Sequence, residues 1–250
     1  MLVQLVSYKS TLRSNSRLSY TAEIINSSQA DLILFAGHTL ASYCDVDELN
    51  TLIDNDKTTA VIEVKNDVRS KAFPVKHSLF LLQNGTVKDM FTHQLFTDSV
   101  TISTYPELGK HLMLELETRR NFITANRKVS IIQCGENNIL RNIQSEGNRP
   151  VFRFEDDIVL SQRFADFLNN TNIILNPIHS PMGNQNKMLK RREFFSDNNR
   201  AYFSTANFND EKSINNKSVQ YAYFNGKVLD PVNRDVVGKR NSYIVRTFGI

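Results

Sequence analysis

Residues 127–137 read RKVSIIQCGEN, an apolar run that leads directly into Cys134, Gly135 and Glu136. The run is rich in β-branched residues, which predicts a strand that is covered on both faces. Where such a strand ends, its last side chains lie at the sheet edge at which α/β proteins bind ligands. Cys134 is therefore a candidate nucleophile, although a small buried hydrophobic side chain is an at least equal interpretation of the same pattern.

Similar apolar runs recur along the chain and alternate with stretches of helical period. Asn84-Gly85 and Asn225-Gly226 each separate two runs, which predicts tight type I′ hairpins. Asp45 and Glu48 predict a capping box at the start of one helix, and a helix is predicted at about 186–196. The pattern predicts a mixed α/β fold, with strands at 2–8, 31–35, 59–65, 78–83, 128–133, 172–176, 201–207, 219–224 and 242–248 and helical stripes at Leu18/Ala22/Ile25, Leu108/Leu112/Leu116 and Leu160/Phe164/Phe167/Leu168.

The composition fits one globular domain. Because 40% of the 250 residues are hydrophobic, the chain can bury a sizeable core. We expect a single domain over residues 1–250. Residues 137–156 are polar and contain a Gly and a Pro, so we expect an insertion loop there, next to Cys134.

Charge, cysteine and histidine usage argue against several classes of protein. The net charge of +4 does not predict nucleic-acid binding. Two cysteines cannot form a disulfide framework of the secreted kind, and neither a signal peptide nor an apolar run of membrane-spanning length is present, so we expect a cytoplasmic protein. The five histidines lack paired ligands at metal-site spacing, and the nine glycines form no phosphate loop, so no metal or other cofactor is expected. The basic cluster is typical of a solvated helix face and comprises Lys187, Lys190, Arg191 and Arg192.

Six stretches, in chain order, resemble the nitrilase (carbon–nitrogen hydrolase) superfamily. The resemblance covers roughly residues 1–135 and 160–250 and leaves the insertion unmatched. It implies a four-layer α-β-β-α sandwich with mixed sheets, a small amide-like ligand and a homodimer or larger assembly. The stretches are MLVQLVSY (1–8), ADLILFAGHTLASY (30–43), SLFLLQNGTVKDMFTHQLF (78–96), RKVSIIQCGEN (127–137), NTNIILNPIHSP with SDNNRAYFSTAN (170–181 and 196–207) and SVQYAYFNGKVL (218–229).

The resemblance implies a cysteine nucleophile, a glutamate general base and a lysine that stabilises the tetrahedral intermediate. The nucleophile falls on Cys134. The base falls on Gly37 and the lysine on His93, or on Thr92 or Gln94 if the register slips by one residue. Two of the three catalytic groups are thus missing, because glycine cannot accept a proton and histidine is not a permanent cation.

Other positions of the resemblance surround the nucleophile. Glu136 keeps the acidic residue that follows the cysteine, and Asn199 persists where the preceding glutamate has become asparagine. His179 lies in a loop that borders the family's substrate pocket. We therefore predict a pocket that contains Gly37, His179 and Asn199 beside Cys134.

Two hypotheses about function follow. The first is a catalytically impaired binding or regulatory module that does not hydrolyse simple amides, nitriles or carbamoylated amino acids, because members of a catalytic constellation act as a unit. The second is a divergent thiol-dependent amide hydrolase or acyl transferase that uses Cys134. Its missing partners would be replaced by His38 or His93 as base, Glu107 or Glu136 as carboxylate, and Lys88 or Lys110 as cation.

Overall fold

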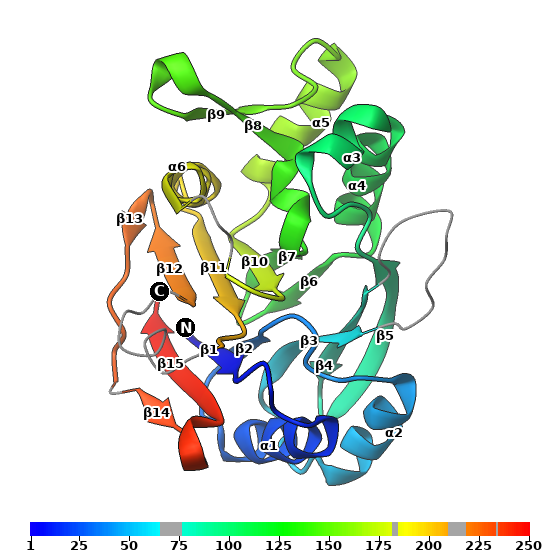
Figure 1. The fold of residues 1–250 in the computed structure, drawn as a ribbon, viewed down its shortest axis with the longest axis vertical. Coiled ribbons are helices and arrows are strands. Elements are labelled where there is room, and N and C mark those ends of the chain that lie inside the picture. The colour runs from blue at the N-terminus through cyan, green and yellow to red at the C-terminus, as the bar shows by residue number, and fades with distance from the viewer. Residues whose placement is uncertain (66–76, 182–184, 210–218, 234) are drawn as a thin grey trace.

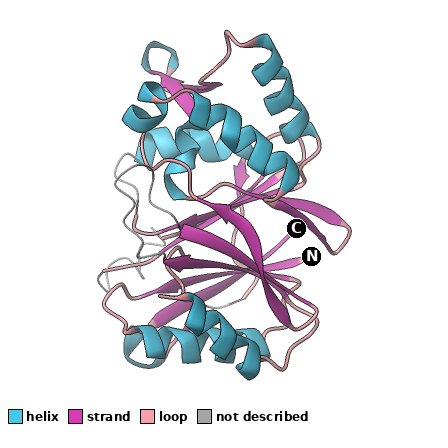
Figure 2. Ribbon diagram, turned by 90° about the vertical axis from the view of Figure 1, so that its right-hand side faces the viewer, coloured by secondary structure: helices cyan, strands magenta, loops and turns pink. Residues whose placement is uncertain are grey.

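Two β-sheets packed face to face form the centre of the computed structural model, which describes residues 1–65, 77–181, 185–209, 219–233 and 235–250 (Figure 1). The first sheet has the strand order β14-β15-β1-β2-β3-β4-β5, and the second has the order β13-β12-β11-β10-β7-β6. Figure 2 shows the sheets stacked between two layers of helices. The predicted four-layer sandwich is confirmed.

The first sheet is mixed. Strands β1, β2 and β3 are parallel, whereas β15, β4 and β5 pair with their neighbours in antiparallel fashion. Its strands are β1 (Leu2–Tyr8), β2 (Leu32–Phe35), β3 (Thr59–Lys65), β4 (His77–Gln83), β5 (Thr86–His93), β14 (Val236–Val237) and β15 (Tyr243–Gly249).

The second sheet repeats this arrangement, with β7, β10 and β11 parallel and hairpin partners on both sides. Both predicted Asn-Gly hairpins are confirmed, because Asn84, Gly85, Asn225 and Gly226 have φ values of 52°, 71°, 50° and 74°. The strands are β6 (Asn121–Thr124), β7 (Arg127–Ile131), β10 (Ile173–Ile178), β11 (Ala201–Ala206), β12 (Gln220–Phe224) and β13 (Lys227–Val228).

The core between the sheets explains why the strands are continuously apolar. Leu5, Leu34 and Val61 of the first sheet cluster with Ile131 and Phe203 of the second, and all five side chains are fully buried. The outer face of each sheet is covered as well, so residues on both sides of a strand lose contact with water. Strands buried on both faces are expected to lack polar alternation.

Helices cover the two outer faces. The first sheet carries α1 (Ser14–Ser27) and α2 (Tyr43–Leu52); the second carries α3 (Ser99–Thr104), α4 (Glu107–Thr118), α5 (Ile158–Asn169) and α6 (Gln185–Phe195). A capping box does begin α2, but Ser42 and Asp45 form it rather than the predicted Asp45 and Glu48. A short 3₁₀ turn, η3 (Lys239–Asn241), precedes β15. Among the described residues, no helix has the length and apolarity needed to cross a membrane.

The segment predicted as an insertion loop forms a hairpin. Residues 134–156 contain the 3₁₀ helix η1 (Cys134–Ile139), strands β8 (Leu140–Ile143) and β9 (Arg149–Phe152), and a second 3₁₀ turn, η2 (Gln144–Glu146). The hairpin projects beyond the second sheet in Figure 1. Arg191 of α6 anchors it by donating to Asn142 Oδ1 at 2.8 Å and to the Leu140 carbonyl at 2.9 Å.

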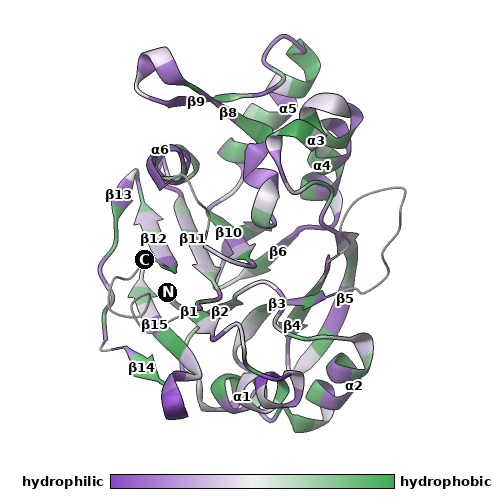
Figure 3. Cartoon of the chain, in the orientation of Figure 1, coloured by the Kyte–Doolittle hydropathy of each residue, from purple (hydrophilic) through white to green (hydrophobic). Residues whose placement is uncertain are grey.

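Helix α6 confirms the helix predicted at about 186–196, and Figure 3 colours much of it hydrophilic. Its basic residues are less exposed than a solvated face would have them, because Arg191 and Arg192 are both buried. The Arg192 guanidinium lies 3.4 Å from the centre of the Tyr221 ring. Together with the hairpin, Arg191 and Lys187 line a polar cavity of about 700 Å³.

Candidate active site

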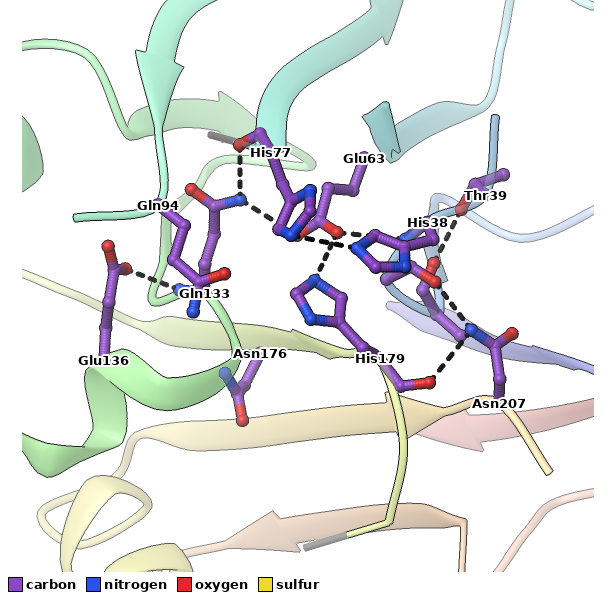
Figure 4. A network of polar contacts seen from close by, with 12 residues as sticks. His38, Thr39, Glu63, His77, Gln94, Gln133, Glu136, Asn176, His179 and Asn207 are labelled. Carbon is purple, nitrogen blue, oxygen red and sulfur yellow. Dashed lines mark hydrogen bonds and ion pairs between the residues drawn. The ribbon is translucent and has the colours of Figure 1, made fainter. Parts of the chain in front are cut away.

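Polar side chains converge where the parallel strands of both sheets end. The carboxyl ends of parallel strands meet at one edge of a sheet, and here the two sheets bring two such edges together. The residues gathered there follow β2, β7, β10 and β11 or lie at the facing ends of β3 and β4: Gly37, His38, Gln133, Cys134, His179, Asn207, Glu63 and His77 (Figure 4 shows most of them).

Glu63 is the carboxylate at the centre of this group. Its side chain is fully buried in β3, and its Oε1 lies 2.6 Å from His179 Nε2 and accepts the His38 N–H at 2.9 Å. Gln133 donates to its Oε2 at 2.9 Å. Burial alone would raise the pKa of Glu63, but the charge and hydrogen bond of His179 outweigh it and hold the pKa at about 2. Glu63 is therefore ionised at neutral pH.

His179 joins this carboxylate to the cysteine. Its Nε2 lies 2.6 Å from Glu63 Oε1, and Cys134 is near enough to act on the protonation of the imidazole. Burial works to lower the pKa of His179, but Glu63 and Cys134 together raise it to about 10. The loop that carries His179 is fixed by Asn207, whose Nδ2 donates to the carbonyls of Gly37 at 2.6 Å and His179 at 3.1 Å. The result is an imidazolium held between a carboxylate and a sulfur.

His38 and His77 complete the group. Their Nε2 atoms lie 3.0 Å apart, and the His38 ring stacks on His179 with 3.8 Å between the ring centres. Burial lowers the pKa of His38 to about 3 and that of His77 to about 4, so both are neutral at physiological pH. His38 takes a left-handed backbone conformation with a φ of 59°, of a kind that often marks functional sites when it occurs outside glycine.

Solved structures that resemble this chain include amidases and a CN-hydrolase superfamily protein. A mutant of the amidase from Nesterenkonia sp. AN1, with acrylamide added to its active-site cysteine, aligns with a TM-score of 0.56 at 11% identity over 98% of this chain and 92% of that one. A CN-hydrolase superfamily protein from Xanthomonas campestris aligns with a TM-score of 0.51 at 9% identity over 100% and 91%. The fold is that of the nitrilase superfamily.

A third protein of similar structure shows the same fold inside a larger enzyme. A glutamine-dependent NAD⁺ synthetase from Cytophaga hutchinsonii aligns with a TM-score of 0.54 at 9% identity, and the alignment covers 99% of this chain but 42% of that one. No protein-family model matches the sequence, and no curated protein matches it. The fold is therefore shared with proteins of 9–11% identity, although neither of those two comparisons finds a match.

Gly37 explains how this nitrilase fold accommodates its unusual site. A Cβ atom added at position 37 would overlap the His179 ring and would lie 3.0 Å from Glu63 Oε1. The resemblance placed the family's glutamate at this position. The absence of a side chain at Gly37 thus leaves room for the imidazole of His179 and the carboxylate of Glu63, which comes from the neighbouring strand.

We expect a Gly37→Ala variant to displace His179 and to lower the free energy of unfolding by about 1–3 kcal/mol, as over-packing of a buried site usually does. Urea titrations of the wild-type protein, Gly37→Ala, His179→Ala and the double variant measure this. Because His179→Ala removes the ring that the new methyl meets, the double variant should be less destabilised than the sum of the two single variants. Additive effects would contradict the proposed contact.

Glu136, which the sequence offered as a catalytic residue, lies in a different environment. It is fully buried, forms a two-pronged ion pair with Arg120, and accepts the backbone N–H groups of Leu95 at 2.7 Å and Gln133 at 2.9 Å. Its oxygens are therefore occupied in fixing the chain around Cys134, and it supports the site rather than facing the sulfur.

The other predicted residues divide between the site and its surroundings. Gly37, His38 and His179 lie together with Glu63, as described above. His93 ends β5, where its carbonyl accepts from Arg120 at 2.7 Å. Asn199 lies in an exposed turn before β11, and its N–H donates to Asn225. Because Asn207 at the other end of β11 contacts the site, the prediction that Asn199 borders the pocket was wrong.

Four residues of the site were not predicted from the sequence: Glu63, His77, Gln133 and Asn207. Glu63 carried a usable signal, because TAVIEVK is otherwise a strand that would be buried on both faces and an acidic residue there demands a partner. The histidines lack metal-site spacing in the sequence, but three of them come together in the fold. His38, His77 and His179 meet around Glu63, with one donor atom of each residue within 4.8 Å of the others.

Proposed function

We propose that this protein is a divergent thiol-dependent amide hydrolase or acyl transferase that acts on a small carbon–nitrogen bond substrate through Cys134. The observation that carries the proposal is the position of His179, whose Nε2 lies 2.6 Å from the buried carboxylate of Glu63 and whose pKa is raised by the neighbouring Cys134. A nucleophile, a histidine and an orienting carboxylate linked in this order are the parts that cysteine hydrolases need. The amidases of similar structure support the substrate class.

In the proposed reaction, the Cys134 sulfur attacks the carbonyl carbon of an amide and forms a tetrahedral intermediate. The intermediate collapses to a thioester as the C–N bond breaks, and His179 gives its proton to the departing amine. His179, now neutral, takes a proton from water or from an acceptor amine, which attacks the thioester. The products are the acid or the new amide, and the cysteine is regenerated. Glu63 keeps the imidazole oriented and stabilises its charged form.

A positive charge near the reacting carbonyl would stabilise the tetrahedral intermediate. Lys65 is the exposed last residue of β3, two positions after Glu63, and its charge helps to lower the pKa values of His38 and His77. We assign to Lys65 the part that lysine plays in the family resemblance, although it comes from another strand. In this proposal, β3 and the loop after β10 supply the two groups that are missing at Gly37 and His93.

The test uses a Cys44→Ser background, because Cys44 is an exposed free thiol that would react nonspecifically. Short aliphatic amides, carbamoylated amino acids and p-nitrophenyl acetate are offered to this protein and to the same protein with Cys134→Ala. We expect turnover, or at least a stoichiometric burst of p-nitrophenolate, that the second variant abolishes. Iodoacetamide should also alkylate Cys134 faster in this protein than in the same background with His179→Gln. A Cys134 that neither acylates nor alkylates would return the protein to the binding-module hypothesis.

A further inference from the structure

The thiol chemistry proposed above leaves two residues at the site without a task. His38 and His77 are not part of the Cys134–His179–Glu63 chain, yet their rings contact each other and both contact the His179 ring. His77 is 96% buried by residue area, since its exposed fraction is 4%, and its Nδ1 has no hydrogen-bond partner among the described residues. The two rings are therefore enclosed by protein at the centre of the site.

The donor atoms of the four side chains lie close enough together to share one ion. His38 Nε2 and His77 Nε2 are 3.0 Å apart, His179 Nε2 and Glu63 Oε1 are 2.6 Å apart, and all four residues offer a donor atom within 4.8 Å of the others. Ligands at about 2.0–2.1 Å from a tetrahedral ion lie about 3.3 Å from one another. Movements of a few tenths of an ångström to about one ångström would bring the four atoms to this separation.

We propose that His38, His77, His179 and Glu63 form a binding site for a divalent transition-metal ion of the zinc class. Three imidazoles and one carboxylate are a donor set that suits Zn²⁺, and their tetrahedral arrangement would fill its coordination sphere from the protein alone. Two Nε2 atoms that face each other at 3.0 Å cannot both carry hydrogen, so at least one presents a lone pair toward its neighbour.

The surrounding contacts hold the ligands in place. Gln133 donates to Glu63 Oε2, which leaves Oε1 directed at the histidines, and Asn207 fixes the carbonyls of Gly37 and His179. Outer contacts of this kind orient metal ligands. Glu63 attracts a cation, whereas Lys65 and the protonated His179 oppose one, so a divalent ion must displace the proton of His179 as it binds.

Metal binding and the proposed thiol chemistry need the same atoms. An ion bound by His179 Nε2 and Glu63 would remove the carboxylate that orients His179 toward Cys134. The metal-bound protein should therefore have a less reactive cysteine. This consequence rests on the proposed function, whereas the metal site itself does not depend on whether Cys134 is a nucleophile.

The experiment measures metal binding on untagged protein that has been treated with a chelator. Titration with Co²⁺ should give one equivalent with the intense visible absorption typical of tetrahedral coordination, and Zn²⁺ should displace it. His77→Ala and His38→Ala should each weaken binding by at least about tenfold. His111→Ala, which removes an exposed histidine from α4, is the matched control and should bind as the wild type does. Circular dichroism confirms that each variant is folded.

Three outcomes would overturn the proposal: no stoichiometric Co²⁺ or Zn²⁺ binding, binding that survives the loss of both His38 and His77, or binding that disappears in Cys134→Ala, since the sulfur is not among the four assigned ligands. The link to thiol chemistry is measured separately. Zn²⁺ should slow iodoacetamide alkylation of Cys134 in the Cys44→Ser background but not in the same background with His77→Ala. A metal that binds at full stoichiometry without slowing alkylation contradicts the link and leaves the metal site standing.

Discussion

Replacement of His179 by glutamine should lower the rate of acyl transfer to Cys134 by about 100- to 10,000-fold, the range typical for loss of a general acid–base group. Glutamine keeps a side chain of similar reach that can hydrogen-bond but cannot exchange a proton at neutral pH. Release of p-nitroaniline from p-nitroacetanilide in the Cys44→Ser background measures this step, because the departing amine must take up a proton.

Two further histidine variants serve as a control and a comparison for this measurement. His111→Gln alters an exposed residue of α4 and should react at the wild-type rate. His93→Gln tests the position that sequence register assigned to the missing lysine. If His93→Gln loses as much activity as His179→Gln, the catalytic assignment made from the structure is wrong. A much smaller loss at His93 supports the chain from Glu63 through His179 to Cys134.

The second large effect concerns stability. Glu136→Gln should reduce the free energy of unfolding by about 3–5 kcal/mol, because it leaves the charge of the fully buried Arg120 without its partner. The substitution keeps the shape of the side chain, so the loss comes from charge rather than from a cavity. Chemical denaturation with urea, monitored by far-ultraviolet circular dichroism, measures it.

Two comparisons separate this explanation from a general intolerance of mutation. Glu117→Gln breaks the partly exposed Arg163–Glu117 pair, which should cost less than about 1 kcal/mol. The double variant Arg120→Met, Glu136→Met removes both buried charges and should recover much of the stability lost in Glu136→Gln. A double variant as unstable as the single one would show that the hydrogen bonds to Leu95 and Gln133, rather than the ion pair, dominate.

Local chemistry explains the parts of the fold that were predicted. The Asn-Gly turns and the β-branched runs encode hairpins and buried strands within a few residues, and the strand 59–65 was predicted with the bounds that the structure has. The hairpin β8–β9 was missed because its strands are four residues each and carry little alternation. Its position depends instead on contacts with Arg191, which lies far along the chain.

The site could be predicted only in part, for a related reason. Motif alignment depends on the order of residues along the chain, so it identified Cys134 and the positions of Gly37 and His179. It could show that a glutamate was absent from position 37, but not that Glu63, 26 positions farther along on the adjacent strand, points into the same space. A sequence motif cannot reveal that a residue from a neighbouring strand has replaced one of its members. The grouping of the three histidines could not be predicted either, because they lie at the ends of β2, β4 and β10, which are distant in sequence.

The proposed thiol chemistry and the proposed metal site both use His179 and Glu63, so the choice of purification method matters for activity assays. Material eluted from a nickel resin would carry a competing ion into the histidine group, and traces of zinc in ordinary buffers would do the same. A screen for amide hydrolysis on such material would detect no activity, because the bound metal ion would inhibit an otherwise active site. Strep-tag or ion-exchange purification, with a chelator removed by gel filtration before assay, gives the preparation on which a negative result has meaning.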